Sequence, residues 1–83
     1  MSIQIISQTQ NESRIYITMQ GKRNEVEISY HVGRGSVDVI VKNASHKAWN
    51  GAGKTYRNLS EAKAAYKSSE MQAMIEYVKE VVA

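Results

Sequence analysis

Apolar and polar residues alternate along the first half of the chain with a period of two, which predicts β-strands. A first strand is expected at about residues 2–9, opened by Ile3, Ile5 and Ile6, and a second strand begins at Arg14. The third strand has the cleanest alternation, with an apolar face and a polar face: Val26, Ile28, Tyr30 and Val32 against Glu25, Glu27, Ser29 and His31. One apolar and one polar face is typical of an antiparallel sheet that is covered on one side.

The fourth predicted strand follows a short turn at Gly33–Arg34–Gly35, and it directs Val37, Val39 and Val41 inward. Ile40 falls on its polar face, beside Ser36, Asp38 and Lys42, so Ile40 is a candidate for an exposed apolar contact. Residues 20–24 are expected to form the loop of an earlier hairpin, with Gly21 free to take a positive φ. The strands therefore follow one another as a meander.

In the last third of the chain the apolar period changes to about 3.6, which predicts helix. Ser60 is the expected N-cap of a short helix at 61–67, preceded by Leu59 in the staple position. A longer helix at 70–82 is expected to begin with a second capping box at Ser69. One apolar stripe should pack on the sheet: Met71, Met74, Ile75, Val78 and Val82. A second stripe runs through Leu59, Ala62, Tyr66, Ala73 and Tyr77, and its members Tyr66, Ala73 and Tyr77 would be left over. The phase changes at Ser68–Ser69, so the two helices are either kinked together or separated there.

These elements predict one domain, residues 1–83, with an α+β fold. A four-stranded antiparallel meander, with a short fifth strand at 54–57 as the alternative, is covered on one face by a C-terminal helix broken near Ser68. The ββββα order is similar to that of the single-stranded-DNA-binding domains of the transcriptional coactivator and Whirly type. The resemblance is one of topology, and it implies nucleic-acid binding as one candidate function.

The composition excludes several classes of protein. The chain has no cysteine, so it has neither a disulfide framework nor a thiolate metal site. No stretch approaches the length of an apolar membrane span, and the N-terminal residues do not have the pattern of a signal peptide, so no membrane partner and a cytoplasmic location are expected.

No cofactor and no enzymatic activity are expected. Residues 51–55 read GAGKT, which resembles a phosphate-binding P-loop, but Ala48 stands at the position of the first glycine and the expected helix cap lies well beyond Lys54. The two histidines, His31 and His46, do not have the spacing of a metal site with the nearby carboxylates. No pair of titratable residues has the pattern of an acid–base site, so the chain is interpreted as non-enzymatic.

The positive charge is concentrated between Lys42 and Lys67, where six lysines and arginines accompany one glutamate, although the whole chain carries a net charge of only +3. The candidate binding residues, for a protein or a nucleic acid, are Lys42, Lys47, Trp49, Lys54, Tyr56, Arg57, Lys63 and Lys67. Cations that follow phosphates and rings that stack on bases suit single-stranded nucleic acid. Trp49 is expected to be buried near Ala62 and Tyr66, with a stacking platform as the alternative.

Two functions follow from these patterns. The first is a small protein-binding module that occupies the acidic surface of a partner, similar in style to the small, cysteine-free α+β inhibitors of phages and mobile elements, including anti-CRISPR proteins. The second is a single-stranded nucleic-acid-binding protein that uses residues 42–67. The modest net charge favours the first. A homodimer is also expected, through Ile40 or through Tyr66 and Tyr77, because a small core leaves apolar residues over.

Overall fold

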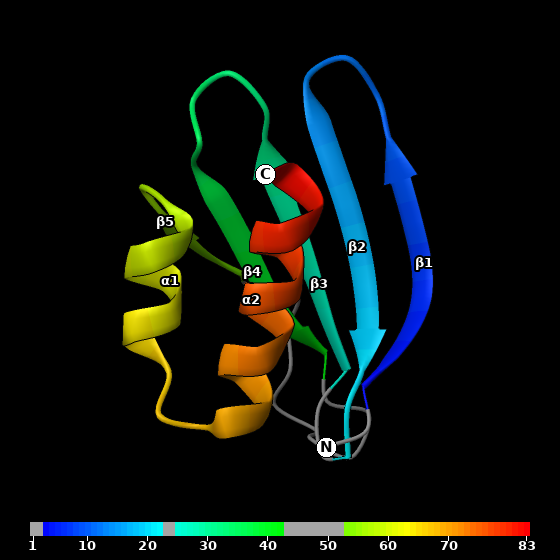
Figure 1. The fold of residues 1–83 in the computed structure, drawn as a ribbon, viewed down its shortest axis with the longest axis vertical. Helices are drawn as coiled ribbons and strands as arrows, with labels where there is room; N and C mark the ends of the chain where they lie inside the picture. The colour runs from blue at the N-terminus through cyan, green and yellow to red at the C-terminus, as the bar shows by residue number, and fades with distance from the viewer. Residues whose placement is uncertain (1–2, 23–24, 43–52) are drawn as a thin grey trace.

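A computed structural model describes residues 3–22, 25–42 and 53–83. Within these ranges an antiparallel sheet holds five strands in sequence order, and two helices lie on one of its faces (Figure 1). The elements are β1 (Gln4–Gln10), β2 (Arg14–Gln20), β3 (Glu25–His31), β4 (Val37–Lys42), β5 (Lys54–Tyr56), α1 (Leu59–Ala65) and α2 (Ser69–Val82). The predicted α+β meander is confirmed, including its short fifth strand and the break in the C-terminal helix. No helix of the described part is long and apolar enough to cross a membrane.

The core lies between the sheet and α2. Ile17 of β2 is paired with Ile28 of β3, and Ile28 is paired with Val39 of β4, so these three side chains form one row across the sheet. The predicted apolar stripe of α2 covers this row. Its buried side chains are Met71, Met74, Ile75 and Val78. The remaining core residues come from the same faces and from one position in α1: Ile15, Met19, Val26, Val37 and Ala62.

The start of α1 differs from the prediction. Its N-cap is Asn58, whose Oδ1 accepts a hydrogen bond from the backbone N–H of Glu61 at 2.8 Å. The predicted cap, Ser60, lies inside the helix, and Leu59 is its first residue rather than a staple before it. The asparagine side chain satisfies a first-turn N–H two residues earlier than the serine could, so the helix begins earlier and ends at Ala65.

The break between the helices is confirmed, but its cap is Ser68 rather than Ser69. Tyr66 has an extended backbone (φ −112°, ψ 133°), which ends α1, and its carbonyl accepts a hydrogen bond from Nε2 of Gln72 at 2.7 Å. Oγ of Ser68 accepts from the N–H of Met71 at 3.3 Å, so α2 begins at Ser69. A side chain from the second helix therefore satisfies a carbonyl that the end of the first leaves free.

Two turn positions also differ from the prediction. The alternation predicts Val32 on the apolar face of the third strand, but Val32 lies past the end of β3 and is 38% exposed. The chain turns there through Gly33 (φ 93°) and Gly35 (φ 76°), both in the left-handed region that favours glycine. Gly21, in contrast, does not have the expected positive φ. It lies against the carboxylate of Glu70, where an added Cβ would overlap that group, so close approach rather than conformation accounts for the glycine.

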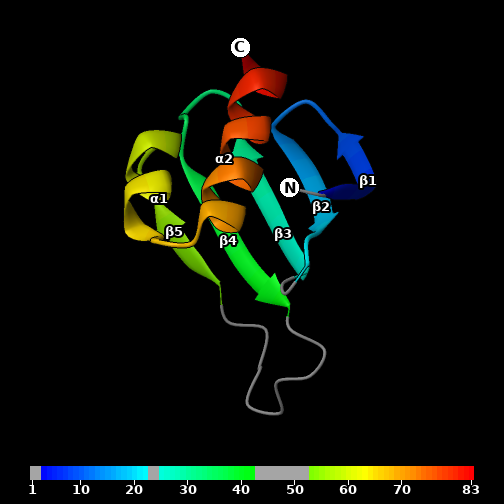
Figure 2. The same ribbon diagram turned by 60° about the horizontal axis from the view of Figure 1, so that its bottom comes forward.

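The two edges of the sheet have different surroundings. β5 lies beside α1, whereas β1 lies at the opposite edge, away from α1 (Figure 2). Every residue of β1 is exposed, and its register with β2 shifts between Ile5 and Ser7. This bulge leaves Ile6 without a partner on β2. The two edges of the sheet are therefore available for different kinds of contact.

Candidate binding surfaces

The described part of the predicted basic stretch gathers around β5 and α1. Lys54 and Tyr56 lie on β5, Arg57 follows it, and Lys63 lies on α1. Lys67 is exposed in the connection between the helices. We call these five residues the basic surface. Of the other candidates, Lys42 is the last residue of β4, whereas Lys47 and Trp49 lie outside the described residues. The expected burial of Trp49 therefore stays a prediction.

The aromatic rings of this region are partly used inside the fold. Tyr56 and Tyr66 meet edge to face, with ring centroids 6.1 Å apart and an interplanar angle of 64°, and both are half-buried. Burial, and after it the neighbouring Tyr56, raise the pKa of the Tyr66 phenol above its ordinary value. Nζ of Lys54 lies 5.8 Å from the centroid of the Tyr56 ring, within the range of a cation–π contact. Tyr56 thus contacts both the ring of Tyr66, the C-cap of α1, and the ammonium group of Lys54.

Carboxylates are interleaved with the cations of the basic surface. Nη2 of Arg57, which precedes α1, lies 2.9 Å from Oε2 of Glu61 in the first turn of that helix. Nζ of Lys63 lies 2.9 Å from Oε2 of Glu76 on α2, and its hydrogen bond and charge hold the pKa of that carboxyl below its usual range. Lys54 and Lys67 form no ion pair with any of the residues the structure describes. The surface therefore has a mixed charge pattern in which Lys54 and Lys67 remain available.

A row of polar side chains crosses the face of the sheet opposite the helices. Nη1 of Arg14 donates to Oγ of Ser29 at 2.9 Å and to Oδ2 of Asp38 at 3.1 Å, while Oγ1 of Thr55 donates to Oδ1 of Asp38 at 2.6 Å. The row joins β2, β3, β4 and β5, and it buries Ser29 to 6% exposure on a face predicted to be solvated. The hydrogen bond from Thr55 lowers the pKa of Asp38, burial opposes it, and the hydrogen bond and charge of Arg14 lower it further.

The alternation of the strands predicted this polar face, but it could not predict the row. Ser29, Asp38 and Thr55 are brought together by strand register, with Ser29 opposite Asp38 and Asp38 opposite Thr55. Register depends on tertiary pairing, so no local pattern signals it. His31 lies near this row, and its Nδ1 is buried without a hydrogen-bond partner in the described protein. Among the residues that the structure describes, no group of three or more His, Cys, Asp or Glu residues is placed to hold a metal ion.

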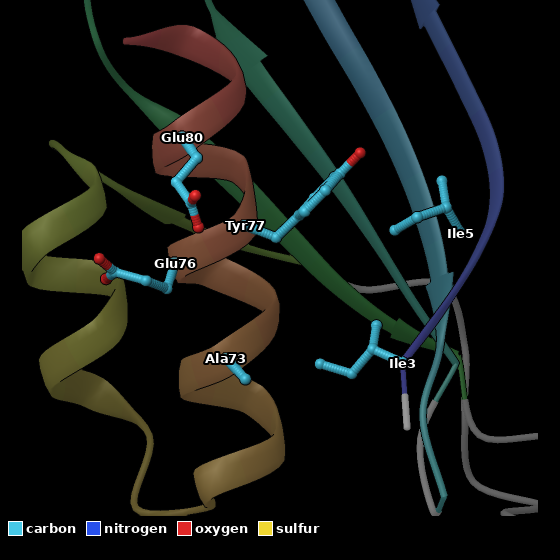
Figure 3. Close-up of a pocket in the computed structure, with 6 residues that line it drawn as sticks. All are labelled: Ile3, Ile5, Ala73, Glu76, Tyr77 and Glu80. Carbon is cyan, nitrogen blue, oxygen red and sulfur yellow. The ribbon is translucent and has the colours of Figure 1, made fainter. Parts of the chain in front are cut away.

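A groove of about 410 Å³ lies between β1 and α2 (Figure 3). Its apolar lining comes from Ile3 and Ile5 on one side and from Ala73 and Tyr77 on the other, with two α2 carboxylates at the margin, Glu76 and Glu80. The hydroxyl of Tyr77 donates to Oε1 of Gln8 at 3.0 Å, which links α2 to the edge strand. No sequence pattern marks this groove, because it depends on how α2 packs beside the edge strand β1.

The three residues expected to mediate self-association are all partly covered by the fold. Ile40 is half-buried against Gly53, where an added Cβ would overlap its side chain. Tyr66 packs on Tyr56, and Tyr77 is half-buried and bonded to Gln8. Among the residues that the structure describes, the exposed large hydrophobic side chains are instead Ile5, Ile6 and Val32. Two of these three belong to β1.

Comparison with known proteins identifies no relative. The chain matches no protein-family model, and no curated protein or solved structure is significantly similar to it. Any functional conclusion therefore depends on the basic surface, the polar row and the edge at β1.

Proposed function

We propose that this chain is a small non-enzymatic protein-binding module that occupies the surface of a partner through its basic surface. The observation that supports this proposal is the interleaving of charges, with Arg57 held by Glu61 and Lys63 held by Glu76. Binding to a phosphate backbone depends on cations that are free to replace its counterions. Tyrosine and arginine, which this surface also carries, are instead enriched at protein interfaces.

The proposed partner presents an acidic surface. Lys54 and Lys67 are the exposed cations of the basic surface without an ion pair among the described residues, and they would lie opposite the partner's carboxylates. Complementary charges of this kind accelerate association and fix the orientation of the partners. This mode of action, in which a compact domain blocks a surface without catalysis, is that of the phage and mobile-element inhibitors, anti-CRISPR proteins among them.

One observation supports single-stranded nucleic acid as the alternative ligand. Lys54 lies over the ring of Tyr56, which places a cation next to an aromatic side chain on the short strand β5. That combination suits a strand whose bases stack while its phosphates contact lysines. However, two of the four cations of the basic surface, Arg57 and Lys63, are already held by the carboxylates of Glu61 and Glu76. Carboxylates within the basic surface would repel a phosphate backbone, which is why we rank the nucleic acid second.

A titration with a generic single-stranded oligonucleotide at low salt separates the two functions. We expect negligible binding by the wild-type chain. Sub-micromolar affinity that disappears by about 200 mM salt would reverse our ranking, because such salt dependence reports the release of counterions from phosphates.

Affinity capture from a nuclease-treated extract of the native host tests the protein partner. The wild-type chain is compared with the double variant Lys54→Glu/Lys67→Glu, which leaves both described ion pairs of the basic surface intact. Arg34→Glu, in the exposed turn between β3 and β4, is the control for the charge change. We expect one protein to be retained by the wild type and by the control but lost with the double variant. Equal capture by all three would contradict the role of the basic surface.

A further inference from the structure

The two edges of the sheet differ in how well they are protected against pairing with another strand. β5 is three residues long and carries Lys54, and both shortness and charge discourage pairing at an edge. β1 is seven residues long, QIISQTQ, with no charged residue and no proline. Its edge away from β2 has no strand neighbour in the described protein. β1 therefore presents unpaired backbone N–H and C=O groups along a strand that nothing in its sequence protects.

One feature of β1 limits pairing, and it leaves most of the strand regular. The bulge at Ile6 interrupts the register with β2, and bulges discourage edge contacts. Beyond it, Ser7 to Gln10 pair with Thr18 to Ile15 without interruption. Ile6 itself is 51% exposed, and Ile5 beside it is 36% exposed. Exposed isoleucines next to unpaired backbone groups are what an interface would cover.

We infer that β1 is the seam of a homodimer, in which it pairs antiparallel with β1 of a second copy about a two-fold axis. The pairing would join two five-stranded sheets into one continuous sheet. It goes beyond the proposed function, because it uses the edge of the sheet opposite the basic surface.

The chemistry of β1 favours a second copy over another partner. About a two-fold axis each strand faces itself, so any charged residue near the axis would meet its own kind, and like charges opposite each other destabilise a sheet. β1 has none, and its polar residues, Gln, Ser and Thr, can donate and accept hydrogen bonds when they face themselves. An uncharged strand is thus complementary to its own copy.

The other edge explains why association would stop at two. Pairing of β1 with β5 of another molecule would be a head-to-tail contact, which produces open filaments. The shortness of β5 and its lysine disfavour that contact. A two-fold β1–β1 contact uses both unprotected edges at once and closes the assembly.

The apolar groove beside β1 adds contact area to the same seam. Ile3 and Ile5 line it from the β1 side, and register places Ile5 opposite Met19, on the face that carries the helices. With pairing centred on Ser7 to Gln10, Ile5 and Ile6 of each copy would lie toward the two ends of the seam, opposite the turn that follows β1 in the other copy. The interface would then combine backbone hydrogen bonds with burial of Ile5 and Ile6, the combination typical of edge-strand addition.

Light scattering on the full chain at tens of micromolar tests the seam. We expect twice the chain mass of 9.3 kDa for the wild type and a fall to the single-chain mass for Ile6→Lys, which places a charge on the edge that would pair. Val32→Lys makes the same kind of change at an exposed valine outside the strands and should remain dimeric. A wild-type monomer, or a dimer that Ile40→Lys dissociates and Ile6→Lys does not, would overturn the inference.

Cross-linking keeps the inference testable even if Ile6→Lys fails to fold. The chain has no cysteine, so a single introduced thiol reports one position. With a short bismaleimide, Ser7→Cys should give a covalent dimer, because pairing around Ser7 to Gln10 brings the two copies of residue 7 close together. Ser13→Cys, in the turn after β1, would lie roughly 30 Å from its counterpart and should not cross-link. Cross-linking at neither position, or equally at both, would overturn the seam.

Discussion

The carboxylate of Glu70 accepts a hydrogen bond from the backbone N–H of Lys22 at 2.6 Å, which joins the first turn of α2 to the turn between β2 and β3. Gly21, the neighbouring residue, lies directly against the same carboxylate. The bond fixes the N-terminal end of α2 over the sheet, next to the buried side chain of Met71. One side chain thus sets the position of the helix that covers the core.

Glu70→Ala should lower the free energy of unfolding by about 1–2 kcal/mol, because it removes a hydrogen bond to a charged group and leaves the N–H of Lys22 without that acceptor. Urea unfolding measures the change. Glu80→Ala, on an exposed turn of the same helix, is the matched control and should alter stability by less than about 0.5 kcal/mol. Equal losses in the two variants would show that the Glu70 contact contributes nothing specific.

Gly21→Ala should cost about 1 kcal/mol in the wild-type background, since the new methyl group would displace the Glu70 carboxylate from Lys22. In the Glu70→Ala background the same substitution should be close to neutral, because the obstructing carboxylate is gone. A double-mutant cycle by urea unfolding measures this coupling. Additive losses would contradict a shared cause.

Asp38 should make the protein sensitive to acid. Its pKa is lowered in the folded state, so the folded protein binds the proton less tightly than the unfolded chain does. Its contribution to stability is therefore complete above the ordinary pKa of 3.8 and is lost as the pH falls through the lower pKa of the folded state. Asp38→Asn should cost about 1 kcal/mol at neutral pH and flatten the loss of stability between about pH 5 and pH 2.

Glu12→Gln is the control for the Asp38 experiment, because it removes an equivalent charge at an exposed position in the turn between β1 and β2. It should leave the acid dependence of the unfolding free energy unchanged. If Asp38→Asn and Glu12→Gln give the same pH profile, the polar row does not act as described.

The contact between Tyr56 and Tyr66 should be measurable as a coupling energy. A cycle of Tyr56→Leu and Tyr66→Leu should give about 0.5–1.5 kcal/mol, the value typical of edge-to-face rings. Because burial raises the pKa of the Tyr66 phenol, the folded state holds that proton more tightly, and stability should fall as the pH rises above the ordinary value of 10.0. Tyr66→Phe should remove this alkaline loss, and a profile identical to that of the wild type would contradict it.

Much of the fold could be predicted because the alternation of β2 to β4 and the stripe of α2 are strong local signals. Ile17, Ile28 and Met74 are fully buried where the two periods place them. The helix caps were displaced by one or two residues, because Asn58 and Ser68 compete with equally suitable serines next to them and only the backbone path decides between them. Val32 was misplaced because alternation continued beyond the point at which two glycines turn the chain.

The candidate surfaces were less predictable than the fold. The sequence predicts that Lys54, Tyr56 and Arg57 lie close together, because they are neighbours in the chain. It could not show that Lys63 pairs with Glu76, which depends on how the two helices meet. The exposed edge at β1 could not be predicted either, because Ile5 and Ile6 have the pattern of core residues, whereas β1 lies at the edge of the sheet with all of its residues exposed.

The strand order, with β1 at one edge and β5 at the other, has a consequence for affinity. Joined at β1, two copies would carry their basic surfaces at the two far ends of one rigid body. Such a dimer could bind two identical acidic sites on a symmetric target at once. After the first site is bound, the second basic surface would bind at a high effective concentration. Weak single contacts through Lys54 and Lys67 would then suffice for tight, slowly released binding, and the fixed span between the ends would select targets whose sites match it.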